Sequence, residues 1–218
     1  MLSNKKNKAL IALNGKRVKN SQKYNKLYDR DKYLFIAADG GAKFLQKINF
    51  IPDIIIGDMD SLSEQELSKY KNYNIKIKKF PVEKNETDGE LAINYCVKKG
   101  IKQIYIIGSQ GGRFDQQLAN IFLLEYAYKK GLEAFIKEPG LEAGIIHNHK
   151  IFKRKTNMRL SLLPLSEEVS KVNITGCKYN TSDIILYRHK TRGISNKILK
   201  NKAEVSIEQG LLLYIINN

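Results

Sequence analysis

The sequence predicts an α/β fold followed by a small all-β domain. In the first part of the chain, short apolar runs alternate with amphipathic stretches at helical spacing. Nearly continuous apolar runs are typical of parallel strands that are buried on both faces. After Pro139 and Gly140 no helical pattern follows, and strand-like runs recur at roughly the 8–12-residue spacing of a sandwich or barrel. We therefore predict a doubly wound, mostly parallel sheet domain over residues 1–138 and a small C-terminal β-sandwich domain over residues 139–218.

From residue 33 on, the predicted elements of the first domain alternate between strand and helix. The strands are 8–13, 33–38, 53–57, 75–80, 103–108 and 133–137. The helices are 41–48, 64–70, 88–99 and 114–130. Strands that alternate with helical patterns favour a doubly wound domain. The basic, weakly patterned segment 14–31 supports no functional interpretation.

The predicted strands of the second domain are separated by Gly, Asn, Ser and Pro. They are 145–150, 158–163, 171–174, 183–187, 203–207 and 211–216. His147 and His149 would share one face of the first of these strands. A zinc site would need further ligands, and none is evident nearby, so an exposed or hydrogen-bonding pair is favoured over zinc.

Composition places the chain among globular proteins. Hydrophobic residues make up 42% and charged residues 28% of the 218 positions, which is enough to build a core. No run approaches the ~20 apolar residues that cross a bilayer, and the first residues do not form a convincing signal peptide. We expect no membrane association and a cytoplasmic location.

The net charge of +16 raises the alternative of nucleic-acid binding. The lysines are dispersed, however, and the longest pure basic run is Lys153–Lys155. Dispersed charge favours a solvated basic surface without a nucleic-acid partner. Cys96 and Cys177 show no disulfide or metal spacing.

Two of the predicted strands end in candidate binding residues. Asp39, Gly40 and Gly41 lie between a strand and a helix, where glycines allow a ligand close to the backbone and free N–H groups can face an anion. A tight turn alone would also explain these glycines. Asp58 and Asp60 follow the strand 53–57, and in an extended chain they would point the same way and could hold Mg²⁺. The alternative is a turn that caps the next helix.

Thr87 and Glu90 form a capping box at the start of helix 88–99. The box does not require Asp88, which is thus a third candidate carboxylate. Glu90 is a further candidate, although the capping box can also explain it.

The fourth candidate segment, Gly108–Asp115, follows the strand 103–108. It is neither a Walker A loop nor a G-x-G-x-x-G motif. It nevertheless offers flexible backbone at Gly111 and Gly112, a helix N-terminus and Arg113, whose guanidinium can bind phosphate oxygens. Carboxylates for a metal and donors for phosphates at one sheet edge suit a Mg²⁺–nucleoside triphosphate and phosphoryl-type transfer.

Six ordered blocks of the sequence carry a resemblance to a known family. They are DGGA (39–42), PDIIIGDMDS (52–61), FPxEKNxTDGELA (80–92), IGSQGGRFDQxLAN (107–120), SLLPLS (161–166) and TRGISN (191–196). Together they resemble the thiamine pyrophosphokinase family, from about residue 33 to the end of the chain. The resemblance implies transfer of pyrophosphate from the co-substrate ATP to the hydroxyl of thiamine, with Mg²⁺. It also implies a catalytic α/β domain, a C-terminal β-sandwich that binds thiamine, and a homodimer with thiamine sites between its subunits.

The resemblance also implies roles for single residues. Asp58, Asp60 and Asp88 would hold Mg²⁺ and the phosphates. Asp115 would lie near thiamine, and its action as a base is a hypothesis. Nucleotide contacts are implied for a larger set: Asp39, Gly40, Gly41, Gly111, Gly112, Arg113 and Gln116. Ser195 and Asn196 would contribute to the thiamine pocket.

The chain departs from the family pattern at several positions. Met59 replaces a common aromatic residue, Gly89 a larger one and Gln116 a common His. The chain has no Trp, so Tyr179 or Tyr187 is the candidate ring for the thiazolium cation. Related folds act on other alcohols, such as a pterin, and this remains the alternative substrate.

Overall fold

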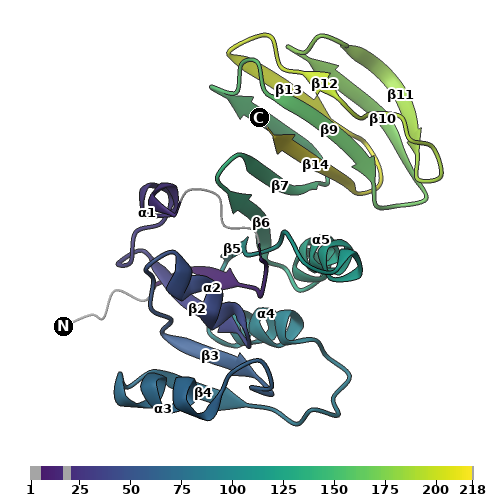
Figure 1. Cartoon of the computed structure of the whole chain (residues 1–218). Coiled ribbons are helices and arrows are strands. Elements are labelled where there is room, and N and C mark those ends of the chain that lie inside the picture. Colours follow the sequence, from purple (N-terminus) through teal and green to yellow (C-terminus); the bar gives the residue numbers. More distant parts are fainter. Residues whose placement is uncertain (1–5, 17–20, 218) are drawn as a thin grey trace. The chain divides into compact units, whose positions relative to one another are not determined.

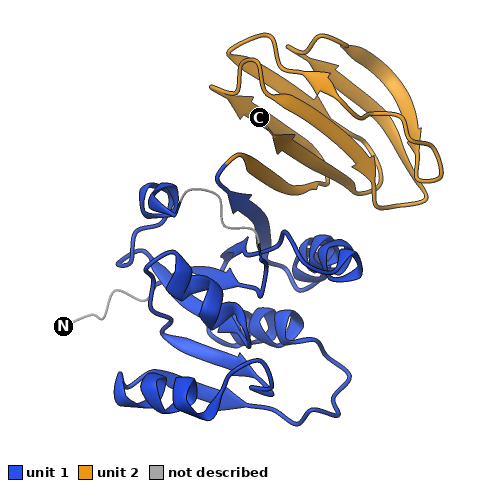
Figure 2. Cartoon of the chain, viewed as in Figure 1, with its two compact units in different colours: residues 1–139 blue, residues 140–218 orange. Residues whose placement is uncertain are grey.

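The computed structural model describes residues 6–16 and 21–217. The chain divides into two compact units, residues 1–139 and 140–218 (Figure 2). The predicted boundary after residue 138 lies beside this division. No helix within the described ranges is both long and apolar enough to cross a membrane.

The first unit is an α/β domain, as predicted. Its strands are β1 (Lys8–Ala12), β2 (Tyr33–Ala38), β3 (Ile54–Gly57), β4 (Lys76–Lys79), β5 (Gln103–Ile107) and β6 (Glu133–Glu138). They pair in parallel in the order β4-β3-β2-β1-β5-β6. All of β3 and most of β1 and β2 are buried, which is why their sequences are continuously apolar.

Helices cover both faces of this sheet (Figure 1). Helices α1 (Gln22–Leu27), α2 (Gly41–Lys47) and α3 (Glu64–Asn72) lie on one face, and α4 (Asp88–Lys98) and α5 (Phe114–Lys129) on the other. Helices α3 and α4 begin with complete capping boxes, at Ser63 with Glu66 and at Thr87 with Glu90. The predicted helix starts at Glu64 and Asp88 are confirmed.

Helix α1 was not predicted, because it lies in the weakly patterned segment 14–31. Tertiary contacts hold it in place: Tyr24 and Tyr28 are buried. The Tyr24 hydroxyl donates to Glu138, and the Tyr28 hydroxyl donates to the carbonyl of Lys137. A short helix of this kind depends on packing more than on local propensity.

The strand order creates a switch point between β1 and β5. The connection from β1 leads to β2 on one side, whereas β5 pairs with the opposite edge of β1. In open α/β sheets, ligands bind in the crevice that forms beyond the carboxyl ends of the strands at such a point.

The second unit is a β-sandwich of two antiparallel sheets. One sheet has the order β12-β9-β14-β7, from Asn196–Lys197, Arg159–Pro164, Leu212–Asn217 and Leu141–Ile146. The other has the order β11-β10-β13-β8, from Thr181–Tyr187, Glu168–Thr175, Lys202–Ser206 and His149–Lys153. Phe152 of one sheet contacts Tyr214 of the other edge to face, at 5.2 Å between ring centroids.

The prediction of one strand over 145–150 is wrong. The chain turns at His147 and Asn148, so β7 ends at Ile146 and β8 begins at His149 in the other sheet. The two histidines therefore do not share a strand face. His149 Nε2 lies 3.3 Å from Glu204 Oε2, and the described residues bring no three-ligand group to either histidine.

Candidate active site

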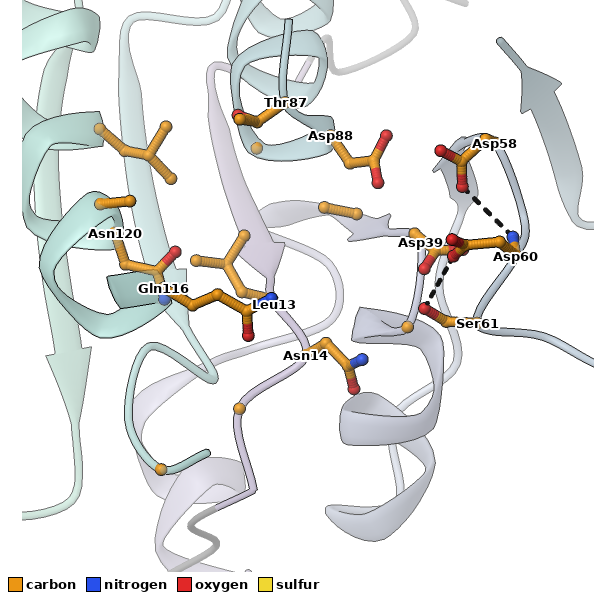
Figure 3. Close-up of a pocket in the computed structure, with 17 residues that line it drawn as sticks. Leu13, Asn14, Asp39, Asp58, Asp60, Ser61, Thr87, Asp88, Gln116 and Asn120 are labelled. Atoms are coloured by element: carbon orange, nitrogen blue, oxygen red, sulfur yellow. Dashed lines mark hydrogen bonds between the residues drawn. The ribbon is translucent and has the colours of Figure 1, made fainter. Parts of the chain in front are cut away.

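A pocket opens at the carboxyl ends of the strands in the first unit. Its volume is about 370 Å³, within the usual range of ligand pockets. The lining residues come from the segments that follow β1, β2, β3 and β5, from the start of α4 and from the first three turns of α5. Aspartates lie on one side of the pocket, and Gln116 and Asn120 lie on the other (Figure 3). Asn14 lies between these two sides.

Three aspartates converge on the acidic side of the pocket. Asp39, Asp58 and Asp60 each offer one carboxylate oxygen, and these oxygens all lie within 4.8 Å of one another. Asp39 follows β2, and the other two follow β3, so neighbouring parallel strands bring them together. Oxygen ligands at this spacing fit a hard divalent cation.

Asp58 and Asp60 converge for a reason that differs from the predicted one. The chain is not extended between them, because Met59 has a left-handed backbone with φ of 70° and is buried in the core. The backbone N–H of Asp60 donates to Asp58 Oδ1 at 3.2 Å, which closes a tight turn. The Ser61 hydroxyl donates to Asp60 Oδ1 at 3.1 Å. Turn geometry, rather than strand alternation, aims both carboxylates at the pocket.

Asp39 is the most buried member of the group, with 6% of its surface exposed. Its Oδ1 is buried and has no hydrogen-bond partner among the described residues. A buried carboxylate oxygen without a donor is costly, so it is expected to face a ligand. This orphaned atom is an observation in favour of a cation at the three aspartates.

Gly57 allows the carboxylates to approach one another. A Cβ at this position would lie 2.9 Å from the Cβ of Asp39 and 3.0 Å from Cγ of Asp88, and its φ is 153°. Only glycine fits this backbone and this space. The last residue of β3 therefore leaves room for the side chains of Asp39 and Asp88 to lie close to it.

Asp88 lies in the pocket but outside the group of three. Lys84 separates it from Asp58: the Lys84 ammonium donates to Asp58 Oδ2 at 2.9 Å and lies 3.2 Å from Asp88 Oδ1. The second contact satisfies an ion-pair distance but not hydrogen-bond geometry, so Asp88 Oδ1 has no donor within the described chain. Asp88 Oδ1 is thus held by the charge of Lys84 without a hydrogen bond from the described residues, and it can still accept one from a ligand.

The surroundings raise the pKa of two of these carboxyl groups and lower the pKa of a third. Burial raises the pKa of Asp39, and the charges of Asp60 and Asp58 raise it further. Burial likewise raises the pKa of Asp88, although Lys84 opposes the shift. The hydrogen bond from Lys84 lowers the pKa of Asp58. Ionised Asp39 and Asp88 are thus poorly stabilised by the protein alone, and a cation would stabilise them.

The turn after β5 forms part of the opposite side of the pocket. Gly111 and Gln116 line the pocket, and Asn120 donates from Nδ2 to the carbonyl of Ser109 at 3.1 Å. Gly112 is not among the lining residues. Of the predicted nucleotide contacts in this turn, the structure brings Gly111 and Gln116 to the pocket.

Arg113 and Asp115 lie outside the pocket lining and pair with each other. Arg113 Nε donates to Asp115 Oδ1 at 3.1 Å, and both side chains are largely exposed. Hydrogen bonding from Arg113 lowers the pKa of Asp115. The structure thus keeps both groups beside the start of α5 without placing either on the pocket wall.

The paired glycines after β2 have different roles. Gly40 lines the pocket, and a Cβ there would collide with the side chain of Asn14. A Cβ on Gly41 would lie 1.9 Å from the carbonyl oxygen of Ala12, so this glycine permits close packing of α2 on β1. Local packing where the strand meets the helix therefore accounts for Gly41 without any ligand.

Two of the three predicted thiamine residues, Ser195 and Asn196, lie in the second unit. Ser195 is exposed with φ of 60°, and its backbone N–H donates to the Ser161 hydroxyl at 3.1 Å. Asn196 is buried: its Oδ1 accepts from the N–H of Tyr179 at 3.0 Å, and its Nδ2 donates to the carbonyl of Tyr179 at 2.7 Å. Tyr179 is 59% exposed, so Asn196 holds the backbone of an exposed aromatic residue.

Sequence reasoning assigned no role to Lys84 or Asn14. Lys84 belongs to the run Glu83-Lys84-Asn85 before the capping box, outside any helix, and no local sequence signal distinguishes it from the other lysines. Asn14 is the second residue after β1, at the edge of the sheet where ligands bind.

A doubly wound α/β domain with an acidic pocket at its switch point, followed by a β-sandwich, defines the protein as a two-domain α/β enzyme. Comparison with family models identifies the family of this enzyme. The model of the thiamin pyrophosphokinase catalytic domain matches residues 24–136, and that of the thiamin pyrophosphokinase vitamin B1 binding domain matches residues 148–212. The chain belongs to the thiamin pyrophosphokinase family.

Individual relatives agree with this assignment. Thiamine pyrophosphokinase of Bacillus subtilis is 28% identical over 190 residues, which cover 86% of this chain and 89% of that protein. Thiamine pyrophosphokinase 1 of Arabidopsis thaliana is 25% identical over 198 residues, covering 86% and 73%. The crystal structure of the Bacillus subtilis enzyme matches with a TM-score of 0.84 and 26% identity, over 97% of this chain and 98% of that one.

Proposed function

We propose that the protein transfers the pyrophosphoryl group of ATP to the hydroxyl of thiamine, in a Mg²⁺-dependent reaction that gives thiamine diphosphate and AMP. The observation that carries the proposal is the convergence of Asp39, Asp58 and Asp60 within 4.8 Å beside a pocket of this family's catalytic domain. Phosphoryl-type transfer depends mainly on positioning and charge neutralisation, which such a site can supply.

Mg²⁺ fits the acidic side of the pocket. Asp58 and Asp60 would hold it, with the unpartnered oxygen of Asp39 as a further ligand. The sequence assigned the third position to Asp88, which instead contacts Lys84; we place Asp88 beside the metal, on the α4 side of the polyphosphate. When bound, the cation would neutralise charge on the phosphate oxygens.

The opposite side of the pocket would contact the nucleotide. Gly111 offers a backbone without a side chain, and Gln116 offers an amide, both facing the pocket. Gly40 lets a ligand approach the end of β2. Arg113 is exposed, and its guanidinium would rotate from Asp115 onto phosphate oxygens when ATP is bound.

In the proposed reaction the thiamine oxygen attacks the β-phosphorus of ATP. The new O–P bond forms as the bond from the β-phosphorus to the bridging oxygen of the α-phosphate breaks, and AMP leaves with that electron pair. The thiamine hydroxyl loses its proton. Asp115 is a weak base while Arg113 lowers its pKa, so it would accept this proton only after Arg113 has moved to the phosphates.

The second unit would bind thiamine. A vitamin B1 binding domain model matches residues 148–212, which include Ser195 and Asn196. Ser195 would contribute its hydroxyl, whereas Asn196 would act by holding Tyr179, whose exposed ring suits a thiazolium cation. We further propose the homodimer that the family resemblance implies, with thiamine sites between its subunits.

The test is incubation of the protein with ATP, Mg²⁺ and thiamine, followed by measurement of AMP and thiamine diphosphate. We expect both products in equal amounts, and none when EDTA removes the metal. Formation of AMP with a pterin alcohol but not with thiamine would overturn the substrate assignment. Turnover that is unchanged in EDTA would overturn the metal assignment.

A further inference from the structure

Glu138 is a buried carboxylate outside the pocket, at the end of β6, with 5% of its surface exposed. Its Oε1 accepts from the backbone N–H of Ser109 at 3.0 Å and from the Ser109 hydroxyl at 2.6 Å. Its Oε2 accepts from the Tyr24 hydroxyl at 2.9 Å. Three donors at one carboxylate compensate for the loss of water around a buried charge.

Ser109 is the residue through which Glu138 reaches the active site. It lies in the turn after β5, where Gly108, Gly111 and Gly112 have φ values of 67°, 83° and 88°. Glycine-rich backbone in this region has little stiffness of its own. Two bonds from one residue to a buried carboxylate therefore hold a segment that local sequence leaves loose.

The same residue connects the turn to the pocket wall. The carbonyl of Ser109 accepts from Asn120 Nδ2 at 3.1 Å, and Asn120 lines the pocket together with Gly111. Ser109 thus donates to Glu138 through its N–H and hydroxyl, and its carbonyl accepts from Asn120 of α5. A shift of Ser109 would move Gly111 and the start of α5 relative to the aspartates.

We infer that Glu138 is a positioning residue for nucleotide binding, acting through Ser109 on the turn after β5. The inference rests on the proposed use of that turn for ATP. Glu138 touches no substrate; its hydrogen bonds set the geometry in which the Gly111 backbone and Gln116 face the polyphosphate. Loss of this anchor weakens the binding of ATP and leaves the affinity for thiamine unchanged.

Two other roles for Glu138 predict different results. If the carboxylate only stabilises the fold, its loss lowers the melting temperature without a specific change in ATP affinity. If its charge matters most, removal of a negative group near the polyphosphate tightens ATP binding. The positioning role predicts weaker binding, so the sign of the change separates the charge role from the positioning role.

The main experiment compares Glu138→Ala with Glu138→Gln. The Ala variant loses all three bonds, and we expect the KM for ATP to rise about tenfold or more while the KM for thiamine stays unchanged. The Gln variant keeps an oxygen that accepts from Ser109, and its amide can donate to the Tyr24 oxygen. It should therefore stay near wild type. A Gln variant as impaired as the Ala variant, or one that binds ATP more tightly than wild type, would overturn the inference.

Two further variants keep the test valid if Glu138→Ala does not fold. Ser109→Ala removes only the hydroxyl bond and should raise the KM for ATP severalfold. Tyr28→Phe is the matched control, because it removes the bond from α1 to the Lys137 carbonyl without touching Ser109. It should lower the melting temperature and leave the KM for ATP unchanged. An equal rise in KM in both variants, or no rise in Ser109→Ala, would contradict the positioning role.

Direct binding separates this inference from the proposed function. The affinity of each protein for an ATP analogue with a methylene α–β bridge is measured by calorimetry, without any turnover. Weaker analogue binding by Ser109→Ala than by wild type supports the positioning role, whatever alcohol the enzyme uses. Equal binding by both proteins contradicts it. Absence of thiamine diphosphate from wild-type incubations counts only against the proposed function.

Discussion

Two regions of the first unit hold buried or half-buried carboxylates, and they hold them in opposite ways. At the pocket, Asp39 and Asp88 each have a buried oxygen with no hydrogen-bond donor among the described residues. At the end of β6, both oxygens of Glu138 accept hydrogen bonds. One region leaves carboxylate oxygens open, and the other satisfies them fully.

The difference shows how one can tell a carboxylate that is placed to bind a ligand from one that holds the fold in place. A satisfied carboxylate contributes to the fold without any ligand, whereas an unsatisfied one costs stability until a ligand arrives. The elevated pKa values of Asp39 and Asp88 express the same cost in the pocket. Substitutions in the two regions should therefore change activity and stability in different proportions.

The largest expected effect is the loss of activity in Asp58→Asn. The substitution keeps the shape of the side chain but removes a charge from the proposed metal site, where coordination is worth several kcal/mol in the transition state. We expect kcat/KM to fall by at least about 10²-fold, with the fold retained by circular dichroism. Asp31→Asn, at an exposed carboxylate outside the pocket, is the control and should be fully active. Near-normal activity of Asp58→Asn would show that the charge of Asp58 does not serve catalysis.

Gly57→Ala tests the geometry that brings the open carboxylates together. The new methyl would press on Asp39 and Asp88, and we expect an activity loss of roughly tenfold to 10²-fold with weaker Mg²⁺ binding. Gly131→Ala is a matched control: its φ is 75°, but a Cβ there meets nothing within 4 Å. Both variants carry backbone strain, so only Gly57→Ala should lose activity. Equal activities, measured at a temperature where both are folded, would contradict the expectation.

Lys84→Met tests the one cation that the protein supplies to the acidic side within the described residues. Without the ammonium, Asp58 and Asp88 repel each other, and we expect the metal-free protein to lose about 1–3 kcal/mol of stability. Added Mg²⁺ should then stabilise the variant more than wild type, because the metal replaces the missing charge. Thermal unfolding with and without Mg²⁺ measures both effects. Lys43→Met, which breaks the more exposed pair with Glu66, should show no metal dependence.

The smallest effect, and one of opposite sign, is expected for Asp39→Asn without metal. The folded pKa of Asp39 is raised by burial, so its contribution to stability is present below the ordinary value of 3.8 and is lost as pH rises through the folded pKa. At neutral pH the neutral amide should therefore stabilise the protein, by about 0.5–2 kcal/mol. Urea unfolding from pH 4 to pH 8 should show this gain growing with pH. A variant less stable than wild type at pH 7 would contradict the argument.

Much of the fold follows from the sequence, because local physics determines it. The strands β1, β2 and β3 have nearly continuous apolar runs, as burial on two faces requires, and the capping boxes at Ser63 and Thr87 fix two helix starts. Helix α1 escaped prediction because Tyr24 and Tyr28 hold it through contacts with residues more than a hundred positions away. The turn between β7 and β8 escaped because His147 and Asn148 carry no strong turn signal.

The sequence could predict that the candidate site lies at the ends of the strands. It could predict only some of the residues that form the site. Asp58 and Asp60 could be paired from their spacing, although the left-handed backbone of Met59 replaced the expected geometry. Lys84 is a plain lysine in a lysine-rich chain until the fold brings it between two carboxylates. Glu138 carries no motif at all.

The sequence by itself determined the chemistry that is available at the ends of the strands: aspartates, glycines and amides directly after apolar runs. Only the tertiary structure decided which of them meet. The distance between Asp39 and Asp58 depends on which strands pair, and the separation of Asp88 from the other aspartates depends on where Lys84 lies. Local patterns encode the identity of these groups, whereas strand order and backbone turns, stabilised by the whole core, set the distances between them.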